Sequence, residues 1–359
     1  MKTDEGMGDA GACPISYDIE NPAKRDSFVT TEQGCAVLRT EQEKKMKIVF
    51  LDAKTIGDDL DLGGFDRLGE VVKYGFSTEE EAAERSKDAD VLIINKVPIN
   101  ERSIGGADHL KLVCVTATGT NNLDKEYLDK RGIAWRNVAG YSTETVAQHT
   151  FALLFYLLEK MSYYDHYVKS GQYTEDVLFT HFSNVFHELT GKTWGIIGMG
   201  TIGRRVADIA KMFGCRVIYY STSGKNNQPG YERADWDTLL TTSDIISVHA
   251  PLNDDTLDLI NAEAFAKMKQ TAIFINVGRG PIVVEEDLYE ALENREIAAA
   301  GLDVLREEPM SRDNPLAKFQ DSSRLIITPH IAWASVEART RLMQIIEGQV
   351  KEFFFGADS

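Results

Sequence analysis

The stretch Thr193-Trp-Gly-Ile-Ile-Gly-Met-Gly-Thr-Ile-Gly203 runs an apolar strand directly into the pattern Gly198-x-Gly200-x-x-Gly203. In such a pattern the first glycine permits a tight turn, the second lets the backbone approach a pyrophosphate, and the third lets the next helix pack close to the sheet. Thr201 and Ile202 open that helix, whose free N–H groups favour a phosphate. The stretch predicts a dinucleotide-binding unit, with a glycine-rich turn that binds no ligand as the alternative.

Strand-like runs alternate with helical segments on both sides of this stretch. The runs span residues 47–52, 91–95, 111–116, 133–138, 216–220, 244–249, 271–277, 298–304 and 325–328. An acidic helical pattern covers 77–88, and a long apolar segment over 145–164 predicts one helix that connects two similar units. This alternation predicts an α/β fold with two parallel sheets covered by helices.

Composition excludes several classes of protein. The chain has 359 residues, 43% of them hydrophobic and 26% charged, which suits two domains with full cores. A net charge of -17 argues against nucleic acid or an anionic membrane as a partner. The longest apolar run, 151–158, is far shorter than the ~20 residues that cross a bilayer.

Cysteine and histidine usage predicts a cytoplasmic protein without a metal site. The four cysteines have no metal-ligand spacing and suit a reducing compartment. The histidines other than His330 also lack metal-ligand spacing: His109, His149, His166, His181, His187 and His249. Residues 1–45 are polar and rich in turns, which predicts a disordered extension or a start upstream of the native one.

Three strand ends carry groups suited to acid–base chemistry on an anionic substrate. Arg279 stands between two glycines directly after a strand, and its planar fork suits a carboxylate. Glu308 follows the next strand and His330 the last one, and a carboxylate neighbour helps a histidine keep a proton. Each residue taken singly has another interpretation. Arg279 could form a surface ion pair, and Glu308 could belong to a solvated turn. His330 could be a hydrogen-bonded structural residue. Their occurrence in one sheet favours a catalytic site.

These motifs, in this order, resemble the D-isomer-specific 2-hydroxyacid dehydrogenase family from about Met46 onward, and the glycerate dehydrogenase and hydroxypyruvate reductase members most closely. The resemblance implies that Arg279 holds the substrate carboxylate, that His330 is the acid and base, and that Glu308 orients it. It also implies main-chain binding of the carboxylate at Thr118 and Gly119. Trp333 would contact the substrate or, equally, pack at a domain crossing. The remaining cofactor contacts implied are Pro251, Val277, Gly278 and Asp303.

The resemblance also implies a domain organisation. A flavodoxin-like substrate domain would comprise residues 46–147 plus 332–359, with a dinucleotide-binding domain, 148–331, inserted into it. We expect a homodimer.

The expected activity is reduction of a small 2-oxo acid, such as hydroxypyruvate or glyoxylate, to the D-2-hydroxy acid, and the reverse. Alternatives are phosphoglycerate or another D-2-hydroxyacid dehydrogenase, and an NAD(H)-sensing protein that resembles transcriptional corepressors and is not an enzyme.

The corner after strand 216–220 bears on the cofactor. It carries Ser221, Thr222, Ser223 and Lys225, and no carboxylate of the kind that usually binds the ribose hydroxyls of NAD. Hydroxyls and a lysine can bind a 2′-phosphate, which slightly favours NADP(H) over NAD(H). Alternatively, Ser221 binds an NAD ribose and Lys225 is a solvated charge.

Overall fold

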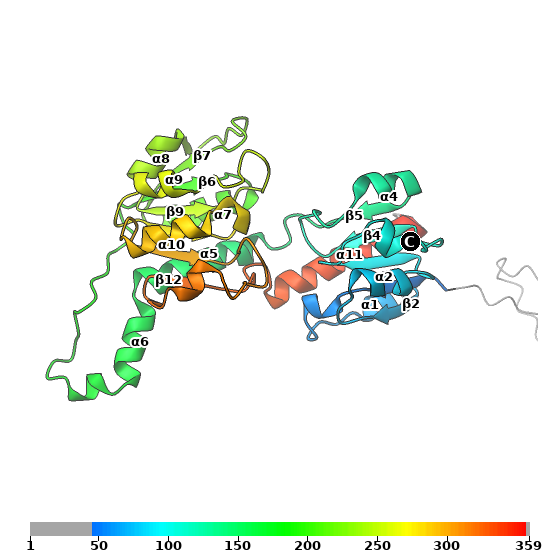
Figure 1. Ribbon diagram of the computed structural model, residues 1–359, viewed down its shortest axis with the longest axis horizontal. Coiled ribbons are helices and arrows are strands. Elements are labelled where there is room, and N and C mark those ends of the chain that lie inside the picture. The colour runs from blue at the N-terminus through cyan, green and yellow to red at the C-terminus, as the bar shows by residue number, and fades with distance from the viewer. Residues whose placement is uncertain (1–44, 357–359) are drawn as a thin grey trace, which may run out of the picture. The chain divides into compact units, whose positions relative to one another are not determined.

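The computed structural model describes residues 45–356 (Figure 1). The predicted extension over 1–45 lies outside the described residues except for Lys45. Within residues 45–356 no helix is long and apolar enough to cross a membrane.

Residues 47–136 form a five-stranded parallel sheet with the order β2-β1-β3-β4-β5. Its strands are β1 (Lys47–Phe50), β2 (Glu70–Lys73), β3 (Val91–Ile94), β4 (Leu112–Val115) and β5 (Ala134–Arg136). The helices between them are η1 (Ala53–Ile56), α1 (Gly63–Asp66), α2 (Glu79–Arg85), α3 (Glu101–Ile104) and α4 (Lys125–Arg131). This order is the flavodoxin-like one.

The apolar strands of this sheet explain its two covered faces. All residues of β3 and β4 are buried, as in parallel sheets covered on both sides. Along β1, Ile48 and Phe50 join one hydrophobic cluster while Val49 joins the other, because successive side chains point to opposite faces.

Residues 193–327 form a seven-stranded parallel sheet with the order β12-β11-β10-β9-β6-β7-β8. Its strands are β6 (Thr193–Ile197), β7 (Arg216–Tyr220), β8 (Glu232–Arg233), β9 (Ile245–Val248), β10 (Ile273–Asn276), β11 (Ala299–Leu302) and β12 (Leu325–Ile327). Its helices are α5 (Thr143–Leu158), α6 (Met161–Lys169), η2 (Gln172–Glu175), α7 (Thr201–Met212), α8 (Trp236–Thr242), α9 (Ala262–Lys267), η3 (Gly280–Ile282), α10 (Glu285–Glu293) and η4 (Pro315–Lys318). The order reverses at β6, which carries the glycine motif, and parallel sheets bind ligands at such a switch point.

The last helix, α11 (Val336–Phe355), packs on the first sheet although it follows the second in sequence. Its residues Leu342, Ile346 and Val350 are fully buried in the cluster that contains Ile48 and Phe50. In Figure 1, α11 (red) accordingly lies beside β4 and β5. The α/β class and both parallel sheets are as predicted; the domain boundaries at 147/148 and 331/332 stay predictions.

The prediction of one helix over 145–164 is wrong, because the helix is interrupted. Lys160 has a left-handed backbone with φ of 54°, which ends α5 at Leu158 and lets α6 begin at Met161. The change in burial agrees, since α5 is apolar and largely buried whereas Tyr167 is the one buried residue of α6. Strands β2 and β8 were not predicted, because both are short and at least partly exposed.

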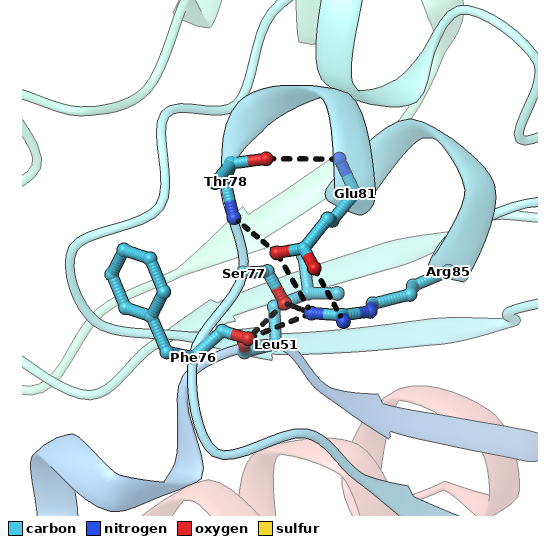
Figure 2. Close-up of polar contacts among 6 residues, drawn as sticks. All are labelled: Leu51, Phe76, Ser77, Thr78, Glu81 and Arg85. Atoms are coloured by element: carbon cyan, nitrogen blue, oxygen red, sulfur yellow. Dashed lines mark hydrogen bonds and ion pairs between the residues drawn. The ribbon is translucent and has the colours of Figure 1, made fainter.

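A polar cluster ties the start of α2 to the end of β1 (Figure 2). Thr78 and Glu81 form a capping box, in which each side chain bonds the backbone N–H of the other. Arg85 donates to the carbonyl of Phe76 and to the Ser77 hydroxyl, both over 2.7 Å, and that hydroxyl donates to the carbonyl of Leu51. The cluster therefore fixes the backbone next to Asp52, the residue that follows Leu51.

Candidate active site

Strand ends of both sheets line a cavity of about 660 Å³. It contains eleven of the predicted site residues: Thr118, Gly119, Ile202, Pro251, Val277, Gly278, Arg279, Asp303, Glu308, His330 and Trp333. The other predicted residues do not line it: Gly198, Gly200, Thr201, Gly203, Ser221, Thr222, Ser223 and Lys225. The predicted substrate and acid–base residues are thus together, and the glycine turn and the loop after β7 lie outside the cavity lining.

His330 and Glu308 form a hydrogen-bonded pair in this cavity. The His330 Nδ1 and Glu308 Oε2 atoms are 2.7 Å apart, and the side chains are 26% and 31% exposed. The other Glu308 oxygen accepts the N–H of Leu305 over 3.1 Å. Burial raises the pKa of Glu308, but the bond from His330, the charges of His330 and Lys96 and the Leu305 N–H together hold it below its usual value. Glu308 is therefore an anion that can orient the imidazole.

Arg279 enters the cavity from the loop after β10. Its Nη1 donates to the carbonyl of Gly278 over 2.8 Å, and the guanidinium makes no ion pair with a carboxylate of residues 45–356. A Cβ at Gly119 would lie 3.0 Å from Arg279 Nη2, so glycine leaves the room that the guanidinium uses. The fork is free to bind a carboxylate from outside the chain.

The loop that carries Thr118 is held by the end of β5. The Thr118 hydroxyl donates to the carbonyl of Val138 over 2.9 Å, and Asn137 Nδ2 donates to the carbonyl of Thr118 over 2.6 Å. These bonds fix the backbone of the predicted carboxylate loop beside Arg279.

Asp303 lines the cavity but is only 1% exposed, because its carboxylate bonds to its own chain. It accepts the Thr328 hydroxyl and the N–H groups of Ile331 and Ala332 over 2.6 to 2.9 Å. Trp333 is half-buried and meets Tyr141 edge to face, with ring centres 6.3 Å apart. The packing proposed for Trp333 is therefore present, while its place in the cavity also leaves it open to a substrate.

The glycine motif has the geometry of a dinucleotide cradle. Gly198 has φ of 94°, and a Cβ there would meet the N of Ala250 at 2.6 Å. A Cβ at Gly203 would lie 2.3 Å from the Gly198 carbonyl oxygen, so the helix packs directly on the turn. A Cβ at Gly200 would meet no protein atom within 4 Å, and this residue begins α7 without a side-chain cap. Open space beside uncapped helix N–H groups fits a pyrophosphate.

The loop after β7 presents the residues predicted to select the cofactor. Ser221 is buried, and its hydroxyl accepts the N–H of Asn226 over 3.2 Å, whereas Ser223 and Lys225 are exposed. Arg204 of α7 reaches this loop through Gln228 over 3.2 Å and was not predicted. Two positively charged side chains are thus associated with this loop: Lys225 belongs to it, and Arg204 contacts it.

His249 contributes an unsatisfied polar atom to the cavity wall. Its Nδ1 is buried without a hydrogen-bond partner within the described residues, and its Nε2 lies 3.0 Å from the Ser247 hydroxyl. Burial lowers the pKa of His249 to about 3, so the ring is neutral near pH 7.

The sequence prediction missed the loop after β3, which carries Asn95 and Lys96 into the cavity. Asp52 holds this loop by accepting the N–H groups of Asn95, Lys96 and Val97 over 2.6 to 3.2 Å. Burial raises the pKa of Asp52 although these bonds oppose the shift. The sequence did offer a signal for this loop, because Asn95 and Lys96 are polar residues directly after a strand. The same signal led to the prediction of Arg279.

Among the described residues, 45–356, no group of three or more His, Cys, Asp or Glu side chains is placed to hold a metal ion.

Comparisons with known proteins show what this chain is similar to. The family model described as D-isomer specific 2-hydroxyacid dehydrogenase, NAD binding domain, matches residues 151–332. The hydroxypyruvate reductase of Blautia hydrogenotrophica is 37% identical over 321 residues, which cover 87% of this chain and 98% of that protein. The glycerate dehydrogenase of Methylorubrum extorquens is 36% identical, with 86% and 96% covered. An acyclic imino acid reductase (Bsp5), solved with NADPH and D-Arg, has a TM-score of 0.76 and 31% identity, with 86% and 97% covered.

Proposed function

The chain belongs to the D-isomer-specific 2-hydroxyacid dehydrogenase family, and from this premise we propose that it reduces hydroxypyruvate or glyoxylate to the D-2-hydroxy acid. Membership makes it an NAD(P)-dependent oxidoreductase of small 2-oxo and 2-hydroxy acids. The observation that carries the proposal is the 2.7 Å pair of His330 and Glu308 in the same cavity as the unpaired fork of Arg279.

Arg279 binds the substrate carboxylate in this proposal. Its guanidinium donates two parallel hydrogen bonds and polarises the adjacent carbonyl, while N–H groups of the loop at Thr118 and Gly119 bind the same carboxylate. Their proximity supports this role, since a Cβ on Gly119 would lie 3.0 Å from Arg279 Nη2.

His330 delivers a proton to the carbonyl oxygen during reduction and removes it during oxidation. The anionic Glu308 fixes the Nδ1 side of the ring, which leaves Nε2 to face the substrate. The nicotinamide cofactor, when bound, supplies or accepts the hydride. Its pyrophosphate would rest at Gly200 and the start of α7, and its nicotinamide end at the cavity-lining Ile202 and Val277.

The choice of substrate rests on the polar wall of the cavity. Lys96 and Asn95 line it, and these donors suit a 2-oxo acid that also bears a hydroxyl group. The relatives named hydroxypyruvate reductase and glycerate dehydrogenase support this choice.

We propose NADP(H) as the preferred form of the cofactor. The loop over 221–228 carries no carboxylate that would repel a 2′-phosphate, and Lys225 and Arg204 offer positive charge near it. The imino acid reductase of similar fold, solved with NADPH, supports the same choice.

We propose a homodimer held through the segment 177–186, named the apolar segment below. It exposes Val177, Phe179, Phe182 and Val185 by 96%, 90%, 78% and 70%. So many exposed large apolar side chains in one short segment mark an interaction surface.

The test is a side-by-side assay of NADPH and NADH oxidation with hydroxypyruvate, glyoxylate, pyruvate and 3-phosphohydroxypyruvate. We expect the highest kcat/KM with hydroxypyruvate or glyoxylate and with NADPH. A preference for 3-phosphohydroxypyruvate would favour a phosphoglycerate dehydrogenase. Cofactor binding without turnover of any acid would favour a sensor that resembles corepressors.

A further inference from the structure

Asp303 holds the turn that presents His330. Three successive N–H groups donate to this one residue: that of His330 to the Asp303 carbonyl over 2.8 Å, and those of Ile331 and Ala332 to its carboxylate over 2.9 and 2.8 Å. His330 has φ of 53°, in the left-handed region that residues other than glycine rarely adopt. Such a conformation persists where the surroundings determine it, and here Asp303 supplies those surroundings.

Two further side chains orient the Asp303 carboxylate. The Thr328 hydroxyl lies 2.6 Å from Asp303 Oδ1, and His149 Nε2 lies 2.9 Å from the same hydroxyl oxygen. A carboxylate only accepts hydrogen bonds, so the hydroxyl proton goes to Asp303 and its oxygen accepts the N–H of His149. This direction places a proton on His149 Nε2. That atom is also 3.5 Å from Asp303 Oδ1.

We propose that His149 and Thr328 are positioning residues for the proton transfer, acting through Asp303 on the turn that carries His330. This inference rests on the proposed function of His330. It gives a role to a histidine of α5 that the reaction itself does not use. His149 belongs to α5, and Asp303 and Thr328 directly follow β11 and β12, so the chain of hydrogen bonds is fixed by the core on which His330 stands.

The alternative is that His149 is a core histidine with a satisfied hydrogen bond and no bearing on the reaction. The two interpretations differ in what removal of the bond does. If the bond only stabilises the fold, its loss lowers the melting temperature and leaves the proton transfer unchanged. If it positions His330, its loss slows the proton transfer in a protein that still folds and binds cofactor.

Paired variants separate the interpretations. Thr328→Val and His149→Leu remove the donors with similar volume, whereas Thr328→Ser and His149→Gln retain a hydroxyl or an N–H donor. Thr150→Val is the matched control, because it removes a buried hydroxyl of α5 that bonds only to the carbonyl of Val146. We expect Thr328→Val and His149→Leu to lower kcat by about 100-fold, the effect of a misplacement of about 1 Å. We expect the retaining variants to recover most of this loss.

Two readouts report on the turn itself. The solvent deuterium isotope effect on kcat should rise in Thr328→Val and His149→Leu, and Thr328→Val should add no further loss to His330→Ala. The amide hydrogens of Ile331 and Ala332 should exchange at least about tenfold faster in the donor-removing variants and at the wild-type rate in Thr150→Val. Unchanged exchange and an unchanged isotope effect would overturn the inference. If the wild type reduces no 2-oxo acid, the proposed function fails, and the exchange rates still decide whether His149 and Thr328 hold the turn.

Discussion

His330 helps to keep Glu308 ionised in the cavity. The folded protein lowers the pKa of Glu308 from its usual value, so the pair stabilises the fold above the usual carboxyl pKa. That contribution is lost as the pH falls through the lowered pKa. Glu308 therefore stays ionised at neutral pH.

Replacement of Glu308 by glutamine tests this charge relation. The amide oxygen still accepts the bond from His330, but the imidazolium loses its negative neighbour. We expect kcat/KM for 2-oxo acid reduction to fall about tenfold or more, because the negative charge beside the proton-transferring ring is lost. Steady-state kinetics of Glu308→Gln beside wild type measure this loss, and equal values of kcat/KM would argue against the pair.

Replacement of Arg279 by lysine tests whether the planar guanidinium group binds the substrate carboxylate through two hydrogen bonds. Lysine keeps the charge and loses the second parallel hydrogen bond to the carboxylate. We expect kcat/KM for the 2-oxo acid to fall about 10- to 100-fold, with the Kd of NADPH within about twofold of wild type. Wild-type kcat/KM in Arg279→Lys would place the carboxylate elsewhere.

Two glycines in the turn from β6 into α7, Gly200 and Gly203, differ in the space around them. A Cβ at Gly203 would meet the Gly198 carbonyl oxygen at 2.3 Å, whereas a Cβ at Gly200 would meet no protein atom within 4 Å. The backbone of Gly200, with φ of -81°, is also open to alanine. One glycine thus serves the packing of α7, and the other leaves room for a ligand.

Alanine at each position separates these roles. We expect Gly200→Ala to keep the melting temperature of wild type and to weaken NADPH binding by about tenfold or more, that is about 1.4 kcal/mol. We expect Gly203→Ala to lower the free energy of unfolding by about 1 to 3 kcal/mol through overpacking. Thermal unfolding and fluorescence titration of both variants measure this. Wild-type affinity in Gly200→Ala would remove the pyrophosphate from this turn.

Elements of the fold could be predicted from the sequence where periodicity was long and apolar. Strands β3, β4 and β10 are such runs, whereas the half-exposed β2 gave no signal and the backbone change at Lys160 broke a helix whose pattern continued. In the site, Arg279, Glu308 and His330 could be predicted because each follows a strand of one sheet. The parts played by Asp52 and His149 could not, because each depends on a contact between segments far apart in sequence.

Residues that follow strands of both sheets line the cavity. Asn95, Lys96 and Gly119 come from the first sheet, and Arg279, Glu308 and His330 follow strands of the second. The chain then returns to the first sheet in α11, whose buried face completes that core. Residues far apart in sequence are thus brought together around one cavity.

The apolar segment over 177–186 predicts the oligomeric state. We expect wild type to sediment at twice the chain mass of 40.0 kDa and the double variant Phe179→Ser, Phe182→Ser to sediment as a monomer or at a much higher Kd. Phe76→Ser is the matched control, because Phe76 is 66% exposed but lies beside β1 and α2 (Figure 2). A double variant that dimerises like wild type would place the interface on another surface.

The most direct test of the account is the rate of NADPH oxidation with hydroxypyruvate for wild type, His330→Ala, His330→Asn and the exposed-histidine control His109→Ala. Asparagine tolerates the left-handed backbone at this position, so His330→Asn separates loss of the imidazole from loss of the turn. The account predicts that both His330 variants lose about 10²- to 10⁴-fold in kcat, with the Kd of NADPH nearly unchanged, and that His109→Ala keeps the wild-type rate. A near-normal rate in His330→Ala or His330→Asn would contradict the assignment of His330 as the acid and base.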